Sequence, residues 1–189
     1  DDTLIGELIK VAQNNVEEYT GRAITQQTLQ LFLDRLPYYI DEKLREGVYT
    51  APDINYSADY IVLPKPPVAS ITHVKYYAND NTASTFAASN YFSDVDSSQA
   101  RVVLKNGVSW PTLTELRQGN AYEVQYVAGY GNSASDVPTP IIQAIKLLTT
   151  HLYENRELVS QNSVNTIPYT VGQLLQPYRV IRLNNILGG

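Results

Sequence analysis

The stretch Val137–Glu157, VPTPIIQAIKLLTTHLYENRE, decides the fold class because it carries the longest helical pattern of the chain. Its first turn contains Pro138 and Pro140, which cost no hydrogen bond there because the first backbone N–H groups of a helix have no intrahelical partner. Four apolar residues fall within about 60° of one another on a helical wheel: Ile141, Ile145, Leu148 and Leu152. We therefore predict a helix over about 138–158 with one apolar face, and Asp136 as a candidate cap.

The polar residues at the end of this helix divide between its two sides. Glu154 and Glu157 lie opposite the apolar face and are expected in solvent. Asn155 and Arg156 project back toward the apolar face, where polar groups need hydrogen-bond partners. We expect Asn155 and Arg156 to join a polar network with another segment or another subunit.

A second helix is predicted near the start of the chain, over residues 3–20. Apolar residues recur there at helical spacing between a capping group, Asp1–Thr3, and Gly21, which is a typical helix stop. From Thr25 the apolar period changes to two, which is typical of a strand. The residues on one face of this strand are Leu29, Leu31 and Leu33.

Further strands follow at intervals of roughly ten residues, with turn-forming clusters between them. They are predicted at Val68–Tyr77, Tyr91–Val95, Arg101–Leu104 and Tyr122–Ala128. This spacing is typical of an antiparallel sheet or a small sandwich. The order of helix, sheet and helix predicts an α+β fold in which the N-terminal helix packs against the long C-terminal helix. The antiparallel β lobe, about 25–130, is inserted between them.

Two segments have no sustained period. Residues 38–58 are polar and rich in Tyr, and they are predicted to form a long loop or a small insertion. Residues 165–189 are predicted to form an extended C-terminal arm with a short apolar piece at Val171–Leu175. We therefore predict one α+β domain over 1–164, followed by this arm.

Composition excludes several classes of protein. The chain has no Cys and only two His among its 189 residues, which leaves no thiolate chemistry and makes a conventional metal site unexpected. Its net charge of −5 argues against a protein that grips nucleic acid through the phosphates. No apolar run approaches the ~18 residues of a membrane span, and the acidic first residues have the wrong charge order for a secretory signal. We expect no cofactor, no metal and no membrane contact.

A catalytic role would pair His151 with Glu154, helical neighbours three residues apart, as a base and the group that orients it. No nucleophile motif accompanies this pair, because the chain has neither a Gly-x-Ser-x-Gly elbow nor a Ser-x-x-Lys sequence. A histidine at the flank of an apolar helix face is more often structural. We therefore expect a protein that is not an enzyme, and a hydrolase using this pair remains the alternative.

Three weaker motifs are also expected to be structural. Gly129–Gly131 lacks the Lys and the glycine spacing of a phosphate-binding loop and is predicted to be a hinge between strand and helix. The acidic residues Asp94, Asp96 and Asp136 lack the spacing of a calcium loop and are predicted to be turn residues. Asn55–Ser57 fits a glycosylation acceptor, but such triplets arise often by chance.

Six blocks, in this order, carry a family resemblance and are spread over most of the chain: LIKVAQNNVEEYTGRAI (Leu8–Ile24), TLQLFLDRLP (Thr28–Pro37), IVLPKPPVASITHVKYY (Ile61–Tyr77), YEVQYVAGYG (Tyr122–Gly131), VPTPIIQAIKLLTTHLYENRE (Val137–Glu157) and LLQPYRV (Leu174–Val180). Their joint order resembles that of the tailed-phage head–tail connector (adaptor) proteins, the gp6-like and phiE125 gp8-like group that includes the adaptors of gene transfer agents. No single block is a chemical motif. Residues 38–58 depart from the family pattern because they are longer than the short link expected there.

The resemblance implies a structural role. Adaptors of this group assemble as a dodecameric ring beneath the portal of the capsid and extend the channel for double-stranded DNA. The implied partners are further copies of the chain, the portal protein and a stopper or tail-completion protein, in the neck of a virion assembled in the host cytoplasm. DNA would pass through the ring without specific binding, since an acidic lining repels phosphates. The 15 tyrosines suit subunit and portal contacts.

The residues expected to contact the portal or a neighbouring adaptor lie mostly in the arm: Leu174, Leu175, Pro177, Tyr178, Arg179 and Val180, with Asn155 and Arg156 completing the set. Removing residues 165–189 is expected to abolish docking and to leave the fold intact. A different class of function remains open, a recognition or carbohydrate-binding module of a phage tail protein. The Tyr-rich residues 38–58 favour this alternative.

Overall fold

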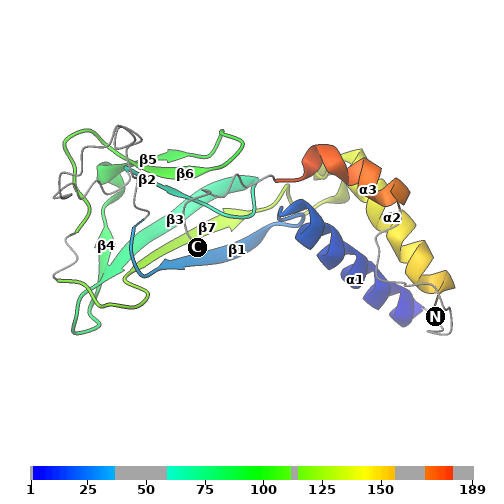
Figure 1. Ribbon diagram of the computed structural model, residues 1–189, viewed down its shortest axis with the longest axis horizontal. Helices are drawn as coiled ribbons and strands as arrows, with labels where there is room; N and C mark the ends of the chain where they lie inside the picture. The colour runs from blue at the N-terminus through cyan, green and yellow to red at the C-terminus, as the bar shows by residue number, and fades with distance from the viewer. Residues whose placement is uncertain (1, 37–58, 112–114, 156–168, 181–189) are drawn as a thin grey trace, which may run out of the picture. The chain divides into compact units, whose positions relative to one another are not determined.

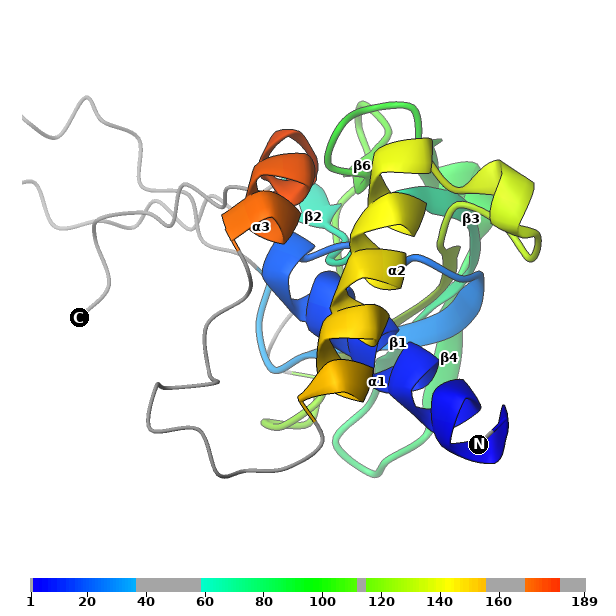
Figure 2. The same cartoon turned by 90° about the vertical axis from the view of Figure 1, so that its right-hand side faces the viewer.

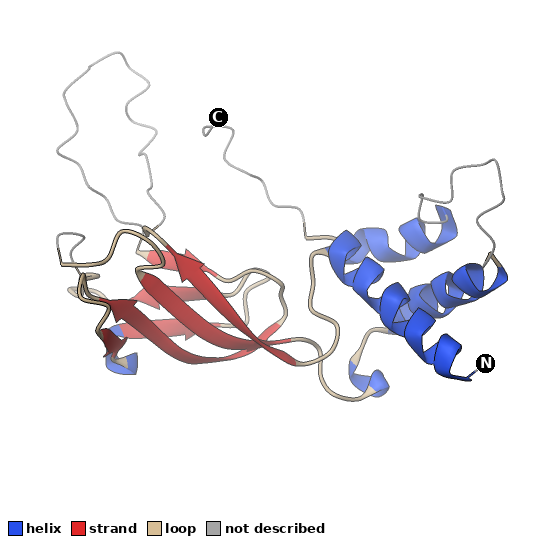
Figure 3. Cartoon of the chain, turned by 90° about the horizontal axis from the view of Figure 1, so that it is seen from below, coloured by secondary structure: helices blue, strands red, loops and turns tan. Residues whose placement is uncertain are grey.

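The computed structural model describes residues 2–36, 59–111, 115–155 and 169–180. Its elements run in the order α1 (Asp2–Thr20), β1 (Gln27–Leu33), β2 (Tyr60–Val62), β3 (Val68–Tyr77), β4 (Ala83–Phe86), β5 (Tyr91–Asp94), β6 (Arg101–Leu104), β7 (Tyr122–Ala128), α2 (Thr139–Glu154) and α3 (Tyr169–Leu175). Short 3-10 turns are η2 (Ala88–Asn90), η3 (Ala134–Asp136) and η4 (Gln176–Tyr178). Helices and strands lie in separate parts of the chain (Figures 1 and 3), which confirms the α+β class. Among the described helices, none combines the length and the apolar character needed to cross a membrane.

The chain divides into two compact units. The helical unit consists of Asp1–Gln26 and Gly129–Gly189, and the sheet unit is Gln27–Ala128. The prediction that residues 1–164 behave as one domain stays a prediction. The predicted insertion at 38–58 lies outside the described residues.

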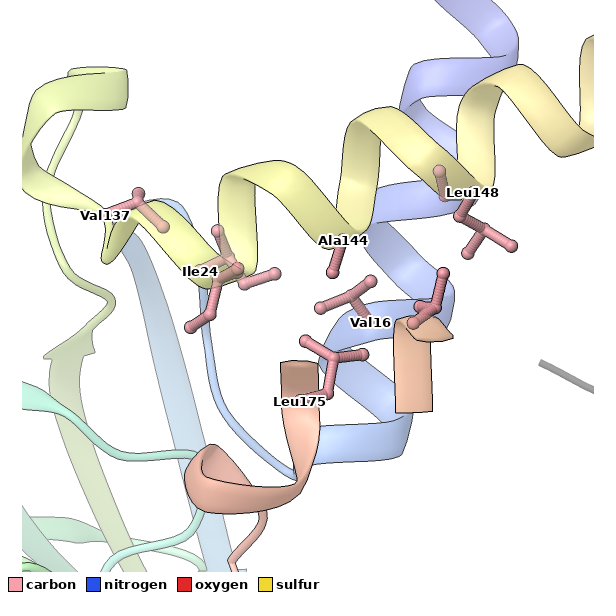
Figure 4. Close-up of a cluster of buried hydrophobic side chains, with 9 residues drawn as sticks. Val16, Ile24, Val137, Ala144, Leu148 and Leu175 are labelled. Carbon is pink, nitrogen blue, oxygen red and sulfur yellow. The ribbon is translucent and has the colours of Figure 1, made fainter. Parts of the chain in front are cut away.

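The helical unit is built around α1, α2 and α3, which pack side by side (Figures 1 and 2). Apolar side chains from all three helices point into one core, as Val16, Ala144 and Leu175 show in Figure 4. The buried residues of this core are Ala12, Val16, Ile24, Val137, Ile141, Ala144, Leu148, Val171 and Leu175. Of the four residues predicted for the apolar face of α2, Ile141 and Leu148 are buried, and Ile145 and Leu152 are half-buried against the same core.

The boundaries of α1 and α2 follow from local chemistry. Gly21 has φ of +69° and donates its N–H to the Glu17 carbonyl at 2.9 Å, which ends α1 where it was predicted to end. The Asp136 carboxylate accepts the Ser133 N–H at 3.0 Å and so caps the turn η3, whereas Pro138 is the cap residue of α2. The prediction of Asp136 as the cap of the long helix is therefore wrong. This helix ends at Glu154, earlier than predicted, because Asn155 leaves the helical conformation.

The sheet unit contains two antiparallel sheets (Figure 3). The first has the strand order β1-β7-β3-β4 and the second has the order β2-β6-β5. The five strands predicted from the apolar pattern are present as β1, β3, β5, β6 and β7. Strands β2 and β4 were missed because neither YIV nor ASTF alternates apolar and polar residues.

Strand β7 is the centre of the first sheet, with β1 on one side and β3 on the other. Its residues Tyr122, Val124, Tyr126 and Ala128 are buried on one face of the sheet. Aromatic rings connect the two sheets, since the Phe86 ring on β4 stacks on the Tyr91 ring on β5 with their centroids 6.2 Å apart. The Trp110 ring continues this cluster, 5.0 Å from the Phe86 ring and 6.3 Å from the Tyr122 ring. The alternation of the strands therefore produces a small sandwich with an aromatic core.

Candidate partner-binding site

The described part of the predicted C-terminal arm is folded, not extended. Residues 169–175 form α3, and the turn η4 follows it. Val171 and Leu175, four residues apart, face the same way on the helix and are 1% and 0% exposed in the core of the helical unit. The short apolar piece was correctly located, but the prediction of an extended arm is wrong for these residues. The physical reason is that burial against α1 and α2 stabilises a helix too short to be stable alone.

A set of polar contacts attaches the end of this segment to the C-terminal end of α1. The Arg22 Nε donates a hydrogen bond to the Tyr178 carbonyl at 2.6 Å. The Val180 N–H donates to the Thr20 carbonyl at 2.7 Å, and the Tyr19 hydroxyl to the Gln176 side chain at 3.4 Å. Carbonyls at the end of a helix lack intrahelical partners, so the chain at Val180 satisfies one that α1 leaves open.

The charges around this attachment are placed to support it. The Arg179 guanidinium lies 5.4 Å from the centroid of the Tyr19 ring, a distance typical of a cation–π contact. Burial raises the pKa of the nearby Tyr130 hydroxyl, although the positive charge of Arg22 opposes the rise. Tyr130 therefore stays neutral and remains a hydrogen-bonding group at neutral pH.

The predicted contact residues of this segment differ in their accessibility. Pro177 and Arg179 are exposed, and Leu174, Tyr178 and Val180 are half-buried. Leu175 is completely buried and cannot reach a partner while the helical unit is folded. The predicted effect of deleting residues 165–189 is corrected accordingly, because the deletion would remove the core residues Val171 and Leu175 and so destabilise the fold.

The end of α2 holds the remaining predicted contact residues. Asn155 is exposed, and its side-chain Nδ2 bonds to the His151 carbonyl at 2.8 Å and lies 3.2 Å from the His151 Nδ1. Asn155 thus caps its own helix, and its predicted contact with another subunit stays a prediction. Arg156 lies outside the described residues. The His151 ring nitrogen contacts the Asn155 side chain of this cap rather than Glu154, which is exposed.

The other motifs identified in the sequence have structural roles where they are described. Gly129 has φ of +122°, and a Cβ built there would lie 2.3 Å from the Thr25 carbonyl oxygen, so the glycine allows two backbone segments to pass closely. Asp94 accepts hydrogen bonds from Arg101 at 2.5 Å and from Ser97 at 2.8 Å. Among the described residues, no group of three or more His, Asp or Glu is placed to hold a metal ion. The glycosylation triplet at Asn55 lies outside them.

The sheet unit contains a polar cluster that the sequence analysis missed. Glu123 on β7 is only 4% exposed and accepts hydrogen bonds from Tyr77, from His73 at 3.0 Å and from Gln30 at 3.4 Å. The strand register brings these groups together, because Lys75 on β3 and Phe32 on β1 pair with Glu123. No sequence motif links residues 30, 73, 77 and 123. Only the alternation of polar residues on the outer face of each strand could have indicated the cluster.

The electrostatics of this cluster favour the charged carboxylate. Burial would raise the pKa of Glu123, but the hydrogen bonds from Tyr77 and His73 and the charge of Lys75 outweigh it and lower the pKa below its ordinary value. The hydrogen bond to Glu123, with burial, raises the pKa of Tyr77. Glu123 is therefore an ionised, hydrogen-bonded group that holds β1, β7 and β3 together, and its partners leave it little capacity to act as an acid or a base.

The second sheet carries exposed apolar side chains on its outer face. Tyr60 on β2 and Phe92 on β5 both pair with Val103 of the central strand β6, so the three form one row across the sheet. Phe92 is 59% exposed and Tyr60 is 37% exposed. The Arg101 guanidinium lies 5.4 Å from the centroid of the Tyr60 ring. Exposed aromatic side chains that lie together are typical of a surface that binds another protein or a ligand.

Comparisons with known proteins identify a shared fold. No protein-family model and no curated protein matches the chain. A chain of the solved structure titled "Virion of native gene transfer agent (GTA) particle" is 22% identical, with a TM-score of 0.72 over 100% of this chain and 81% of that chain. A chain of "Neck of empty GTA particle computed with C6 symmetry" has the same identity and TM-score, with 100% and 82% covered. A chain of "Neck of native GTA particle computed with C12 symmetry" is also 22% identical, with a TM-score of 0.71 and 98% and 85% covered.

Proposed function

We propose that this chain, which shares its fold with chains of gene transfer agent necks and virions, is a structural neck component of a tailed phage or phage-like particle. It acts as a head–tail adaptor that forms a dodecameric ring beneath the portal, extends the DNA channel and provides the attachment platform for the stopper or tail. Its partners are further copies of itself, the portal protein and the stopper or tail-completion protein. It has no catalytic role and is a resident of the virion, assembled in the host cytoplasm.

The observation that carries this proposal is the extent of the structural similarity. The superposition covers 98–100% of this chain, so both the helical unit and the sheet unit have counterparts in the matched chains. Two of the matched structures are necks of gene transfer agent particles computed with C6 and C12 symmetry. A subunit of such a ring needs two different faces that complement each other.

The chemistry of the chain is compatible with a channel for DNA. Its net charge is −5, and a surface of this sign repels phosphates rather than retaining them. The described C-terminal segment, residues 169–180, is attached to α1 by the hydrogen bond from the Val180 N–H to the Thr20 carbonyl. Pro177 and Arg179 are exposed beside this point and are available to a partner. We therefore place the portal contact at the C-terminal segment.

The test is to mix the protein with its cognate portal and to image the complex by electron microscopy. We expect twelvefold rings stacked on the portal. The variant Arg179→Glu should weaken portal binding, whereas Lys146→Glu, the same charge change on an exposed residue of α2, should not. Absence of rings would contradict the proposed function. Equal portal binding by the wild type and by Arg179→Glu would contradict the placement of the portal contact at this segment.

A second candidate function is a recognition module of a tail protein, and the exposed Tyr60 and Phe92, on either side of the half-buried Val103, favour it. Aromatic side chains on an open sheet bind the apolar faces of sugars or peptides. This function would be supported if the isolated protein binds glycans, if Phe92→Ala abolishes that binding, and if the protein has no affinity for the portal.

A further inference from the structure

Among the described residues, β1 and β4 are the two edge strands of the four-stranded sheet, each paired with one neighbouring strand. Natural proteins protect such edges with charged residues, proline or β-bulges, because unpaired backbone groups recruit other strands. The sequence of β1 is QTLQLFL and that of β4 is ASTF, and neither contains a charged residue or a proline. The pairing of β1 with β7 is regular over all seven residues, and the register shifts of the sheet occur between β3 and β7.

The side chains of β1 also suggest that it is incompletely covered. Leu29, Leu31 and Leu33 face the core but are only half-buried, while the residues of β7 opposite them are buried. On the other face, Phe32 is 42% exposed. A strand with apolar residues on both faces and no protecting charge is suited to accept a further strand.

Strand direction identifies the partner. Each neighbouring pair in the order β1-β7-β3-β4 is antiparallel, so β1 and β4, at the two ends of four alternating strands, run in opposite directions. When a second copy is placed beside the first in the same orientation, its β4 therefore meets β1 of the first copy in antiparallel order. Antiparallel pairing is the more stable arrangement, and a contact between two different edges repeats from copy to copy.

We propose that the partner at this edge is a second copy of the chain, and that β4 of one subunit adds to β1 of the next. The four-stranded sheet then continues from subunit to subunit, and the edges disappear when the ring closes, as they do in a barrel. This inference rests on the proposed ring and names the contact that closes it. A twofold pairing of β1 with β1 would instead leave β4 at an edge and would stop at a dimer.

Disulfide crosslinking tests the pairing directly, because the chain has no Cys of its own. Gln30 pairs with Gln125 and Thr85 pairs with Lys75, and both Gln30 and Thr85 are exposed on the outer face of the sheet. Two double-Cys variants cover two neighbouring strand registers: Gln30→Cys/Thr85→Cys and Thr28→Cys/Thr85→Cys. When the concentrated protein is oxidised, we expect a ladder of crosslinked species larger than dimers. Each single-Cys variant should remain uncrosslinked.

Lysine substitutions at the edges provide a second, independent measurement. Thr28→Lys and Thr85→Lys place a charge on each edge strand and should abolish rings, with far-UV circular dichroism and Trp110 fluorescence unchanged. The matched control is Ser98→Lys, an equally exposed position outside both strands, which should assemble as the wild type does.

The possible outcomes separate this inference from the proposed function. Rings that survive both lysine substitutions and give no ladder would overturn the β1–β4 contact while leaving the adaptor role intact. Dimers from Gln30→Cys alone would overturn it in favour of a twofold pairing. A protein that forms neither rings on the portal nor a ladder would contradict the proposed function and this contact together.

Discussion

The Arg22 side chain donates a hydrogen bond of 2.6 Å to the backbone carbonyl of Tyr178, a residue 156 positions further along the chain. Two positions beyond Tyr178, the Val180 N–H bonds to the Thr20 carbonyl. These contacts attach the last described residues to the end of α1. The end of the segment that we propose to bind the portal is therefore held in position, which reduces the entropy that binding must remove.

Replacing Arg22 with Ala should release this attachment. The substitution leaves a partly buried carbonyl without its charged donor, which costs about 1–3 kcal/mol. We expect faster amide hydrogen exchange at Val180 and weaker portal binding, with the rest of the helical unit little changed. Arg35→Ala, at an exposed position of the sheet unit, serves as the control. Unchanged exchange at Val180 in Arg22→Ala would show that the contact does not hold the segment.

Replacing Leu175 with Ala tests whether α3 belongs to the core. Leu175 is fully buried, so the cavity left behind should lower the free energy of unfolding by about 2–5 kcal/mol. Leu174→Ala, next to it but half-buried, should cost less. All described α-helices lie in the helical unit, so the loss should appear in denaturation followed at 222 nm. Equal losses in the two variants would contradict the placement of α3.

Replacing Glu123 with Gln should make the free energy of unfolding of the sheet unit depend less on pH. The pKa of Glu123 is lower in the folded protein than its ordinary value of 4.5, so the ionised carboxylate stabilises the fold above that pH, and the stabilisation is lost as pH falls through the lower folded pKa. We expect the variant to be less stable by about 1–2 kcal/mol near neutral pH. The difference should be smaller at a pH below 4.5 than near neutral pH.

Urea denaturation followed by fluorescence of Trp110, the one tryptophan of the chain, measures this effect in the sheet unit. Glu115→Gln removes an exposed carboxylate from the same unit and should leave the pH dependence unchanged. If Glu123→Gln lowers the free energy of unfolding by the same amount at both pH values, the loss comes from altered packing and not from the ionised carboxylate.

Replacing Gly129 with Ala should disrupt the helical unit. The backbone has φ of +122° there, and the added Cβ would meet the Thr25 carbonyl oxygen at 2.3 Å, which the two backbone segments cannot accommodate without moving. We expect a loss of more than about 3 kcal/mol or failure to fold. Gly6→Ala, in α1 with open space around it, should instead raise the melting temperature because alanine favours a helix. A normal melting temperature for Gly129→Ala would refute this account.

The sequence predicted those elements whose periodicity extends over several turns or residue pairs. The stripe of Ile141 and Leu148 placed the core face of α2, and the alternation in Val68–Tyr77 gave β3 with its exact limits. The α+β class follows from their order. Three short elements were missed or misassigned. Strands β2 and β4 do not alternate apolar and polar residues, and α3 has only seven residues, too few to establish a helical period.

The candidate sites could be predicted much less well from the sequence than the long helices and strands. Leu175 was predicted to be a contact residue because it is apolar and close to the end of the chain, but the structure buries it in the core. The cluster around Glu123 had no local sequence pattern, since its members come from three strands. Contacts between residues far apart in the chain depend on strand register and helix packing.

Local sequence patterns were enough to show which segments become the long helices and strands and which of their faces are apolar, and the composition showed that the chain has no thiol. These properties are local or additive and can be read from neighbouring residues. Three further properties arise only in the folded chain: residues 169–180 pack back onto α1, Glu123 is buried among hydrogen-bond donors, and β1 and β4 form the edges of one sheet. Such properties depend on which distant segments pack together, because burial and pairing are settled by the fold as a whole.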